Sequence, residues 1–303
     1  NKQSTGPITV SAKAPVKLSD AAKNLIGSRP VFDVTVSYQR DGRAEYITDF
    51  GKGAVTLGIA YKSSGGETTG NLFGVYIDKK GRPQPLVNSR YENGRMVIGR
   101  NSLSAYGVGY KAPITEFADT ANHWAKESID FVAGYSLIDG TAPTAFSPDT
   151  AITRADFLMA LGRLSGADVS GYEASSFTDV KGTDPAMPYI EWAVKNKIVQ
   201  GIGSGKFGPG QQISRQDMAV MMQSYAKAAG YKLPMSASAS AFSDNAKIGA
   251  YARDAVAAIR QAGIMQGKGG NTFEPQGNAT RAEASVIVRR FAELVIGQST
   301  VGN

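Results

Sequence analysis

Three arginines in the second half of the chain each follow a threonine or serine directly, in the pairs Thr153-Arg154, Ser214-Arg215 and Thr280-Arg281. Two residues after each arginine comes an acid: Asp156, Asp217 and Glu283. This order predicts a helix N-cap and a capping box. The planar donors of an arginine beside unpaired N–H groups at a helix start suit a carboxylate. The alternative is an ion pair inside the protein, to the acid two residues on or to a neighbouring repeat.

The pairs belong to a longer pattern that occurs three times. Segments that begin at Ile129, Ile190 and Val256 align without a gap. They share a glycine, a phenylalanine and a proline: Gly140, Phe146 and Pro148; Gly201, Phe207 and Pro209; Gly267, Phe273 and Pro275. Chance does not place so many residue types at identical offsets three times. The arginines are 61 and 66 residues apart, a period long enough for two helices in each repeat.

These offsets predict two helices joined by an extended turn in each repeat. Apolar residues at helical spacing mark the first helix, as with Trp124, Ile129 and Val132. The glycine permits a turn that a side chain would obstruct, and Phe-x-Pro favours extended backbone. The second helices are predicted to cover residues 157–164, 218–225 and 284–294.

Residues 30–110 predict strands instead. Residues 31–38 alternate between apolar and mostly polar side chains, which is typical of a half-buried strand. Further strands are predicted at 45–48, 54–61, 71–78, 95–99 and 103–110, separated by turns that contain glycine. Ser19 is expected to cap a short helix over 19–26. We therefore expect an all-β, sandwich-like domain.

Composition excludes several kinds of site. The chain has 303 residues and no cysteine, and the absence of cysteine excludes thiol catalysis and thiolate metal sites. It has one histidine, His123. Four carboxylates in the strand region are scattered rather than paired for catalysis: Asp33, Asp41, Glu45 and Asp49. We expect no catalytic residue, no metal and no cofactor. We also expect no nucleic acid partner and no insertion into a membrane.

The net charge of +7 is unevenly distributed. Residues 1–112 hold 16 Lys and Arg against 8 Asp and Glu, and the remaining residues hold 17 against 18. A basic domain attracts polyanions or simply improves solubility, and both interpretations stay open. Residues 1–11 lack the apolar core of a signal peptide, so we expect a mature protein or a segment of a longer one.

The repeats resemble the S-layer homology (SLH) family. The residues that carry the resemblance are Phe117-x-Asp119, His123-Trp124-Ala125, Gly140, Phe146-x-Pro148 and Ile152-Thr153-Arg154-Ala155-Asp156, then Phe177-x-Asp179, Gly201, Phe207-x-Pro209 and Ile213-Ser214-Arg215-Gln216-Asp217, then Phe242-x-Asp244, Gly267, Phe273-x-Pro275 and Ala279-Thr280-Arg281-Ala282-Glu283. The resemblance covers roughly residues 115–297. The expected organisation is a β-domain at 1–112, repeats at 113–170, 171–235 and 236–298, and a tail at 299–303.

The resemblance implies a fold, a ligand and a location. Three SLH repeats form an all-α, pseudo-threefold unit with three prongs. Grooves between the prongs bind secondary cell wall polysaccharide, often through a terminal pyruvylated N-acetylmannosamine. The partner is thus a glycopolymer attached to peptidoglycan, and the expected location is the wall and S-layer of a Gram-positive bacterium. The expected ligand-binding residues are Arg154, Arg215 and Arg281, together with the turn glycines Gly140, Gly201 and Gly267.

The residue before each turn glycine is often a serine in this family, where it hydrogen-bonds the sugar. Here the residues are Asp139, Gln200 and Gln266. Glutamine keeps a donor, but the carboxylate of Asp139 should repel an anionic sugar, so we expect a weaker groove there. Trp124 and Tyr251 occupy matching places before the first helices, where they either stack on a sugar or pack into the core.

The leading hypothesis is non-covalent anchoring to the cell wall, with the β-domain as a spacer and no enzymatic activity in this segment. One alternative is the C-terminal part of a polysaccharide-degrading surface enzyme, which would need paired carboxylates in one cleft. The other is an S-layer lattice protein whose β-domain makes glycan or protein contacts.

Overall fold

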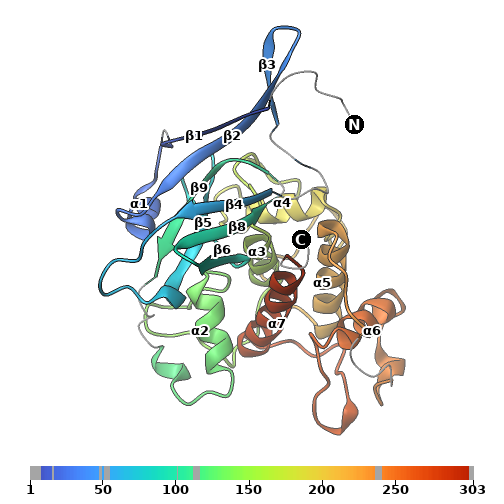
Figure 1. The fold of residues 1–303 in the computed structure, drawn as a ribbon. Coiled ribbons are helices and arrows are strands. Elements are labelled where there is room, and N and C mark those ends of the chain that lie inside the picture. The colour runs from blue at the N-terminus through green and yellow to red at the C-terminus, as the bar shows by residue number, and fades with distance from the viewer. Residues whose placement is uncertain are drawn as a thin grey trace. The chain divides into compact units, whose positions relative to one another are not determined.

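The computed structural model describes residues 8–15, 17–47, 50, 55–100, 102–111, 117–235 and 241–299. The chain divides into two compact units, Asn1–Pro113 and Ile114–Asn303. The regular secondary structure of the first unit is mainly strands and that of the second is mainly helices (Figure 1).

The first unit holds two antiparallel sheets and one short helix, α1 (Asp20–Ile26). Its strands are β1 (Ile8–Lys13), β2 (Val31–Arg40), β3 (Arg43–Ile47), β4 (Val55–Ala60), β5 (Leu72–Ile77), β6 (Pro83–Leu86), β7 (Ser89–Glu92), β8 (Arg95–Arg100) and β9 (Ala105–Tyr110), with a 3-10 turn at Thr69–Asn71. The larger sheet has the order β1-β2-β9-β5-β6, with β3 also paired to β2, and the smaller sheet has the order β4-β8-β7.

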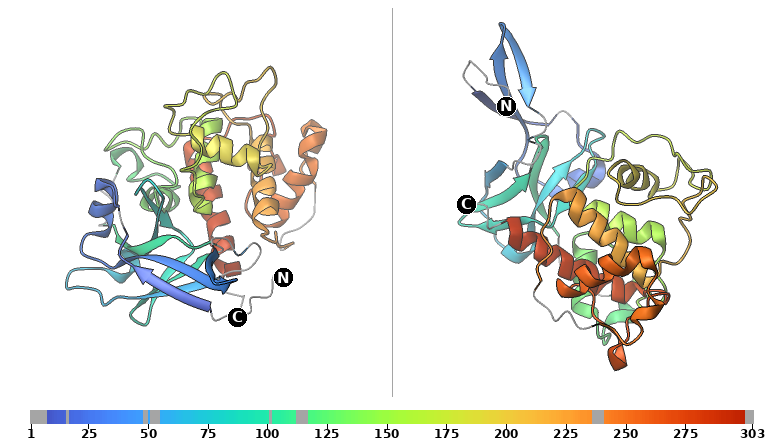
Figure 2. Two further views of the ribbon diagram at one scale, coloured as in Figure 1. Left: turned by 90° about the horizontal axis from the view of Figure 1, so that it is seen from above. Right: turned by 90° about the vertical axis from the view of Figure 1, so that its right-hand side faces the viewer.

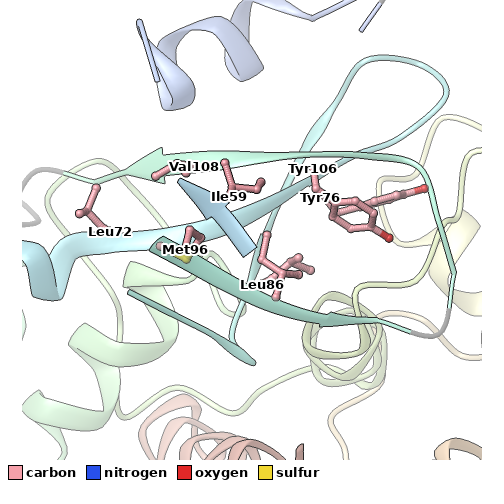
Figure 3. Packing of buried hydrophobic residues seen from close by; sticks show 8 residues of the cluster. Ile59, Leu72, Tyr76, Leu86, Met96, Tyr106 and Val108 are labelled. Carbon is pink, nitrogen blue, oxygen red and sulfur yellow. The ribbon is translucent and has the colours of Figure 1, made fainter. Parts of the chain in front are cut away.

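Both sheets contribute to one hydrophobic cluster (Figure 3). Its buried members are Ile59, Leu72, Tyr76, Leu86, Met96, Ile98, Tyr106 and Val108. A Cβ at Gly74 of β5 would lie 2.7 Å from Cγ1 of Ile98 in β8, so glycine lets the two sheets approach closely. This cluster therefore joins the two sheets.

Most predicted strands are present, and three strands escaped the sequence analysis. β1 presents Ile8 and Val10 to solvent, and β6 contains Pro83 and Pro85, which are unusual inside a strand and fit an edge position. β7 has only four residues. The predicted cap of α1 is confirmed, since Oγ of Ser19 accepts the N–H of Ala22 at 3.2 Å. The expectations for residues 48, 49, 51–54 and 112–116 lie outside the described residues.

The second unit is helical, with two helices for each repeat. The helices are α2 (Lys126–Gly134), α3 (Arg154–Ser165), α4 (Met187–Lys195), α5 (Arg215–Ala229), α6 (Arg253–Gln261) and α7 (Arg281–Ser299). Short 3-10 turns lie at Ala118–Thr120, Asn245–Lys247, Ala250–Ala252 and Gly269–Asn271. The second helix of each repeat begins at its arginine, Arg154, Arg215 or Arg281, which is three residues before the predicted start.

The helices pack across repeat boundaries. The second helices α3, α5 and α7 contact one another, while α4 packs on α3, α6 on α5 and α2 on α7 (Figures 1 and 2). Each first helix therefore packs on the second helix of a different repeat. Glycine again allows two elements to pack closely, here α3 and α4, because a Cβ at Gly162 of α3 would lie 2.5 Å from Cδ1 of Tyr189 in α4.

A triangle of backbone hydrogen bonds joins the three repeats at matching positions. The N–H of Ile152 donates to the carbonyl of Ala279 at 3.0 Å, Ile213 donates to Ile152 at 3.1 Å, and Ala279 donates to Ile213 at 3.2 Å. All three side chains are buried. These residues stand two positions before the arginines, so the triangle places all three arginines around one centre.

Candidate functional site

The caps predicted for the three second helices are present. The side chains of Thr153, Ser214 and Thr280 accept the N–H of the acid three residues on, at 3.1, 3.2 and 3.1 Å. In the third repeat Glu283 also accepts the N–H of Thr280 at 3.1 Å, which completes a capping box. Local sequence thus decides where each helix begins.

The helix-start N–H groups are not available to a ligand, and this corrects the sequence analysis. The N–H of Arg154 donates to the carbonyl of Gln211 at 2.8 Å, and that of Ala155 donates to Pro209 at 3.1 Å. The same two bonds recur at α5 with Gly277 and Pro275, and at α7 with Thr150 and Pro148. With the third N–H held by the cap, the neighbouring repeat satisfies the donors that a free helix start would offer.

Each arginine side chain also reaches the neighbouring repeat, where it meets carbonyl oxygens. Arg154 donates from Nε to Phe207 at 3.2 Å and from Nη2 to Gln200 at 3.1 Å. Arg215 donates in the same way to Phe273 at 2.8 Å and Gln266 at 2.9 Å. Arg281 donates to Phe146 at 2.9 Å and to the carbonyl of Asp139. Gln200, Gln266 and Asp139 therefore contact the arginines through their main chains.

The guanidinium groups lie on the phenylalanine rings of the Phe-x-Pro turns. Cζ is 4.8 Å from the Phe207 centroid in Arg154, 5.1 Å from Phe273 in Arg215 and 4.7 Å from Phe146 in Arg281. Stacking of this kind adds cation–π attraction to the hydrogen bonds. Each ring in turn contacts the opening phenylalanine of its own repeat, with centroid distances of 5.2 to 5.5 Å.

The turn glycines are required for space rather than for backbone conformation. None of Gly140, Gly201 and Gly267 has a positive φ. A Cβ at these positions would lie 2.6 to 2.8 Å from the opening phenylalanine, and 2.7 to 2.8 Å from the carbonyl oxygen before Phe146, Phe207 or Phe273. The glycines therefore let the turn close on the Phe–Phe pair beneath the arginine.

The three arginines differ in exposure although their contacts match. Arg215 is 3% exposed and Arg281 is 7% exposed, whereas Arg154 is half-buried. Burial lowers the pKa of all three guanidinium groups from its ordinary value. In the described part of the chain, the two side-chain hydrogen bonds of Arg154 use Nε and Nη2, and those of Arg281 use the same two atoms.

Asp139 carries its charge beside a cation that the sequence analysis overlooked. Arg163, on the last turn of α3, donates from Nη1 to Oδ2 of Asp139 at 2.8 Å and to the carbonyl of Ser136 at 3.0 Å. Arg163 neutralises part of the charge that was expected to repel an anionic sugar, and the weaker groove stays a prediction. Arg290 holds the matching position in the third repeat and donates to the carbonyl of Ile264 at 3.5 Å.

The two aromatic side chains are on the surface, so the core-packing interpretation is wrong for both. Trp124 is 68% exposed and Tyr251 is 62% exposed. The hydroxyl of Tyr251 donates to Oδ1 of Asp217 at 2.7 Å. Partial burial and this hydrogen bond raise the pKa of Tyr251 to about 12, so the phenol stays neutral and protonated. Tyr251 of the third repeat thus reaches the helix start of the second.

His123 holds the chain before α2. Its Nδ1 accepts the N–H of Ala125 at 3.1 Å, and Nε2 lies 3.3 Å from Asp149. The histidine therefore orients the segment that carries Trp124, whose ring centroid is 5.4 Å from the imidazole. Within the described ranges, no group of three acidic, histidine or cysteine residues is placed to hold a metal ion. No helix among the same residues has the length and apolar character to span a membrane.

Three acids that the sequence analysis gave no role support the turns. Asp119 accepts the N–H groups of Phe146 and Ser147, Asp179 those of Phe207 and Gly208, and Asp244 those of Phe273 and Glu274, at 2.7 to 3.1 Å. Burial opposes ionisation of Asp119 and Asp244, but these bonds outweigh it and lower the pKa of both carboxyls. The sequence does indicate these acids, because each stands two residues after a phenylalanine in all three repeats.

Three stretches of the chain match the S-layer homology domain, at residues 116–158, 176–219 and 241–285. They contain the three helix-start arginines and the three turn glycines described above.

Several known proteins are similar to more than half of this chain. An amylopullulanase of Thermoanaerobacterium thermosulfurigenes is 36% identical over 178 residues, which is 58% of this chain and 9% of the relative. Exoglucanase XynX of Acetivibrio thermocellus is 33% identical over 65% of this chain and 18% of its own length. An S-layer protein of Bacillus thuringiensis subsp. finitimus is 24% identical over 65% of this chain and 24% of its own length.

The chain thus spans less than a quarter of the length of each of these relatives. The repeated residues, the helices that they begin and the family match agree on the C-terminal part. This chain therefore contains three S-layer homology domains, matched at residues 116–158, 176–219 and 241–285.

Proposed function

We propose that the C-terminal unit anchors a secreted surface protein non-covalently to the bacterial cell wall by binding a wall glycopolymer. The three domains form a pseudo-threefold unit in this proposal, and the ligand binds in grooves that hold the arginines. The triangle of backbone bonds between Ile152, Ile213 and Ala279 supports the threefold arrangement. The names of the relatives, which include glycan-degrading enzymes and an S-layer protein, are consistent with one anchor serving different surface proteins.

The observation that carries the proposal is that Arg154 is partly exposed, whereas Arg215 and Arg281 are buried. Two carbonyls and a phenylalanine ring hold the Arg154 guanidinium in place, and its remaining donors point to no protein acceptor among the described residues. An arginine whose orientation is already determined loses little entropy when it binds a planar carboxylate. A pyruvyl ketal on a sugar supplies such a group, so we propose a pyruvylated secondary cell wall polysaccharide as the ligand.

The exposed aromatic rings of Trp124 and Tyr251 offer flat apolar surfaces for a sugar ring. The main-chain carbonyls of Asp139, Gln200 and Gln266 hold the arginines. The exposed side chains of Gln200 and Gln266 are available to sugar hydroxyls, whereas that of Asp139 is paired with Arg163. In this proposal the glycines and phenylalanines position the arginine, and the arginine and the aromatic side chain contact the glycan.

The N-terminal unit is a β-sandwich spacer in this proposal, and the segment has no enzymatic activity. Its two sheets share a core, as a spacer that holds its shape requires. The activity of any longer protein to which the segment belongs would come from other domains. Incubation of the chain with candidate wall glycans tests this part, because newly formed reducing ends would contradict it.

Co-sedimentation with purified cell walls tests the anchoring. The chain should pellet with native walls and lose most of its binding when the pyruvyl groups are removed. Arg154→Gln should weaken binding to native walls by about tenfold or more, because one charged hydrogen bond is worth roughly 1.5–3 kcal/mol. Arg253→Gln is the matched control, since Arg253 also begins a helix, α6, but is exposed. Equal binding to native and depyruvylated walls would remove the carboxylate from the mechanism.

A further inference from the structure

The three arginine sites have the same framework but face different numbers of carboxylates. This inference rests on the proposed function and concerns which site the ligand occupies. Asp217 is the carboxylate that acts on Arg154 in the described structure. Glu283, Glu274 and Asp244 act on Arg215, and Asp156, Asp139 and Asp119 act on Arg281. Arg154 is also the most exposed of the three arginines, so an anionic ligand meets the weakest internal competition there.

The Arg154 site comprises Arg154, Gln200, Gly201, Asp217 and Tyr251. Both oxygens of the Asp217 carboxylate are occupied: the hydroxyl of Tyr251 donates to Oδ1 at 2.7 Å and that of Ser214 donates to Oδ2 at 2.7 Å. These two hydrogen bonds stabilise the negatively charged Asp217 carboxylate and fix its position. The guanidinium beside them remains half-exposed.

The Arg215 site comprises Arg215, Gln266, Gly267, Lys268 and Glu283, with Glu274 beside it. Nζ of Lys268 lies 3.2 Å from Oε2 of Glu274 and 3.2 Å from Oε1 of Glu283, and Nη1 of Arg215 lies 3.9 Å from the same Glu283 oxygen. Two cations and two carboxylates therefore neutralise one another, and Arg215 is 3% exposed. Thr141 and Ile202 hold the place of Lys268 in the other repeats, so this ion-pair network belongs to the third repeat.

The Arg281 site comprises Arg281, Asp139, Gly140 and Asp156. Arg163 pairs with Asp139 at 2.8 Å, and Arg281 is 7% exposed. At this site the charge of Asp139 is paired within the protein, and Arg281 itself is nearly fully buried on main-chain carbonyls. The three sites thus divide into one open site and two closed sites.

We infer that the Arg154 site is the primary site for a sugar that carries a carboxylate. Burial and an ion-pair network close the Arg215 site to such a sugar, and burial closes the Arg281 site. The Lys268–Glu274–Glu283 network is a latch on the Arg215 site: an anion gains access only by displacing a carboxylate of the protein. Sequence matching alone would assign three equivalent sites.

Titration calorimetry of the full chain tests the inference, with the methyl glycoside of 4,6-O-pyruvyl-N-acetylmannosamine as the probe. The native chain should bind one equivalent at low probe concentration. Arg154→Gln should abolish that binding. Tyr251→Phe is a milder change at an exposed residue, and it should weaken binding about tenfold because Asp217 loses a hydrogen-bond donor. Glu274→Gln removes one charge from the latch and keeps its shape, so affinity at Arg215 should rise about tenfold and a second equivalent should appear.

Glu293→Gln is the control for Glu274→Gln, because Glu293 is an exposed carboxylate about 15 Å further along α7 than Glu283. It should leave the stoichiometry at one. Three equal sites in the native chain, or full binding in a folded Arg154→Gln protein, would overturn the inference and leave the proposed function intact. Absence of binding in the native chain and in every variant would instead remove the proposed function itself.

Discussion

Arg281→Met tests whether the arginines also hold the three domains together. Arg281 is 7% exposed and joins the third domain to the first through the carbonyls of Phe146 and Asp139 and the ring of Phe146. Methionine keeps much of the apolar stem but donates nothing, so two charged hydrogen bonds are lost and two carbonyls lose a partner. At roughly 1.5 kcal/mol or more for each bond, we expect a loss of about 3 kcal/mol in the free energy of unfolding.

For a unit of this size, a loss of that magnitude lowers the midpoint of thermal unfolding by about 6–12 °C. Circular dichroism of the helical signal follows the second unit, because its helices dominate that signal. Arg154→Met should cost about half as much, since Arg154 is half-buried and water replaces part of the lost bonding. Arg253→Met, at an exposed helix start, should change stability by less than about 0.5 kcal/mol. A midpoint for Arg281→Met within about 2 °C of the native value would refute the assignment of the arginine as a link between domains.

Three further predictions concern the turns and the surface. Gly201→Ala should destabilise the second unit by about 1–3 kcal/mol in thermal unfolding, because its Cβ would lie 2.7 Å from the Phe177 ring and from the Lys206 carbonyl oxygen. The pKa of Asp244 is lowered from 3.8 in the folded protein, so the stability that its carboxylate contributes is complete above pH 3.8 and disappears as the pH falls through the folded-state pKa. Unfolding measured from pH 6 to pH 2 should therefore depend less on pH in Asp244→Asn than in the native chain. An unchanged pH profile in that variant would contradict this. Trp124→Ala should leave the unfolding midpoint within about 2 °C of native and reduce co-sedimentation with walls; an aromatic side chain in the core would instead cost several kcal/mol.

Features that depend on neighbouring residues could be predicted from the sequence. The caps at Thr153, Ser214 and Thr280 are satisfied by groups three residues away. The strand β2 follows from alternation over a few residues, and β6 was missed because its two prolines are unusual inside a strand. β1 was missed although Ile8–Lys13 alternates between apolar and polar residues. The prediction of free N–H groups at the helix starts was wrong because their partners, such as the Gln211 carbonyl for Arg154, belong to another repeat.

By itself, the sequence determined that three similar units exist, where their second helices begin, and that an arginine stands at each start, because these properties repeat at constant short offsets. Only the tertiary structure decided what each arginine meets. Its partners lie 46 to 142 residues away in the chain, and they are main-chain carbonyls, which carry no side-chain signature. The tertiary structure also decided that Arg154 is open while Lys268 and Arg163 neutralise carboxylates at the other two sites. Exposure and charge pairing arise from residues that the fold brings together, so three matching motifs became one open site and two closed ones.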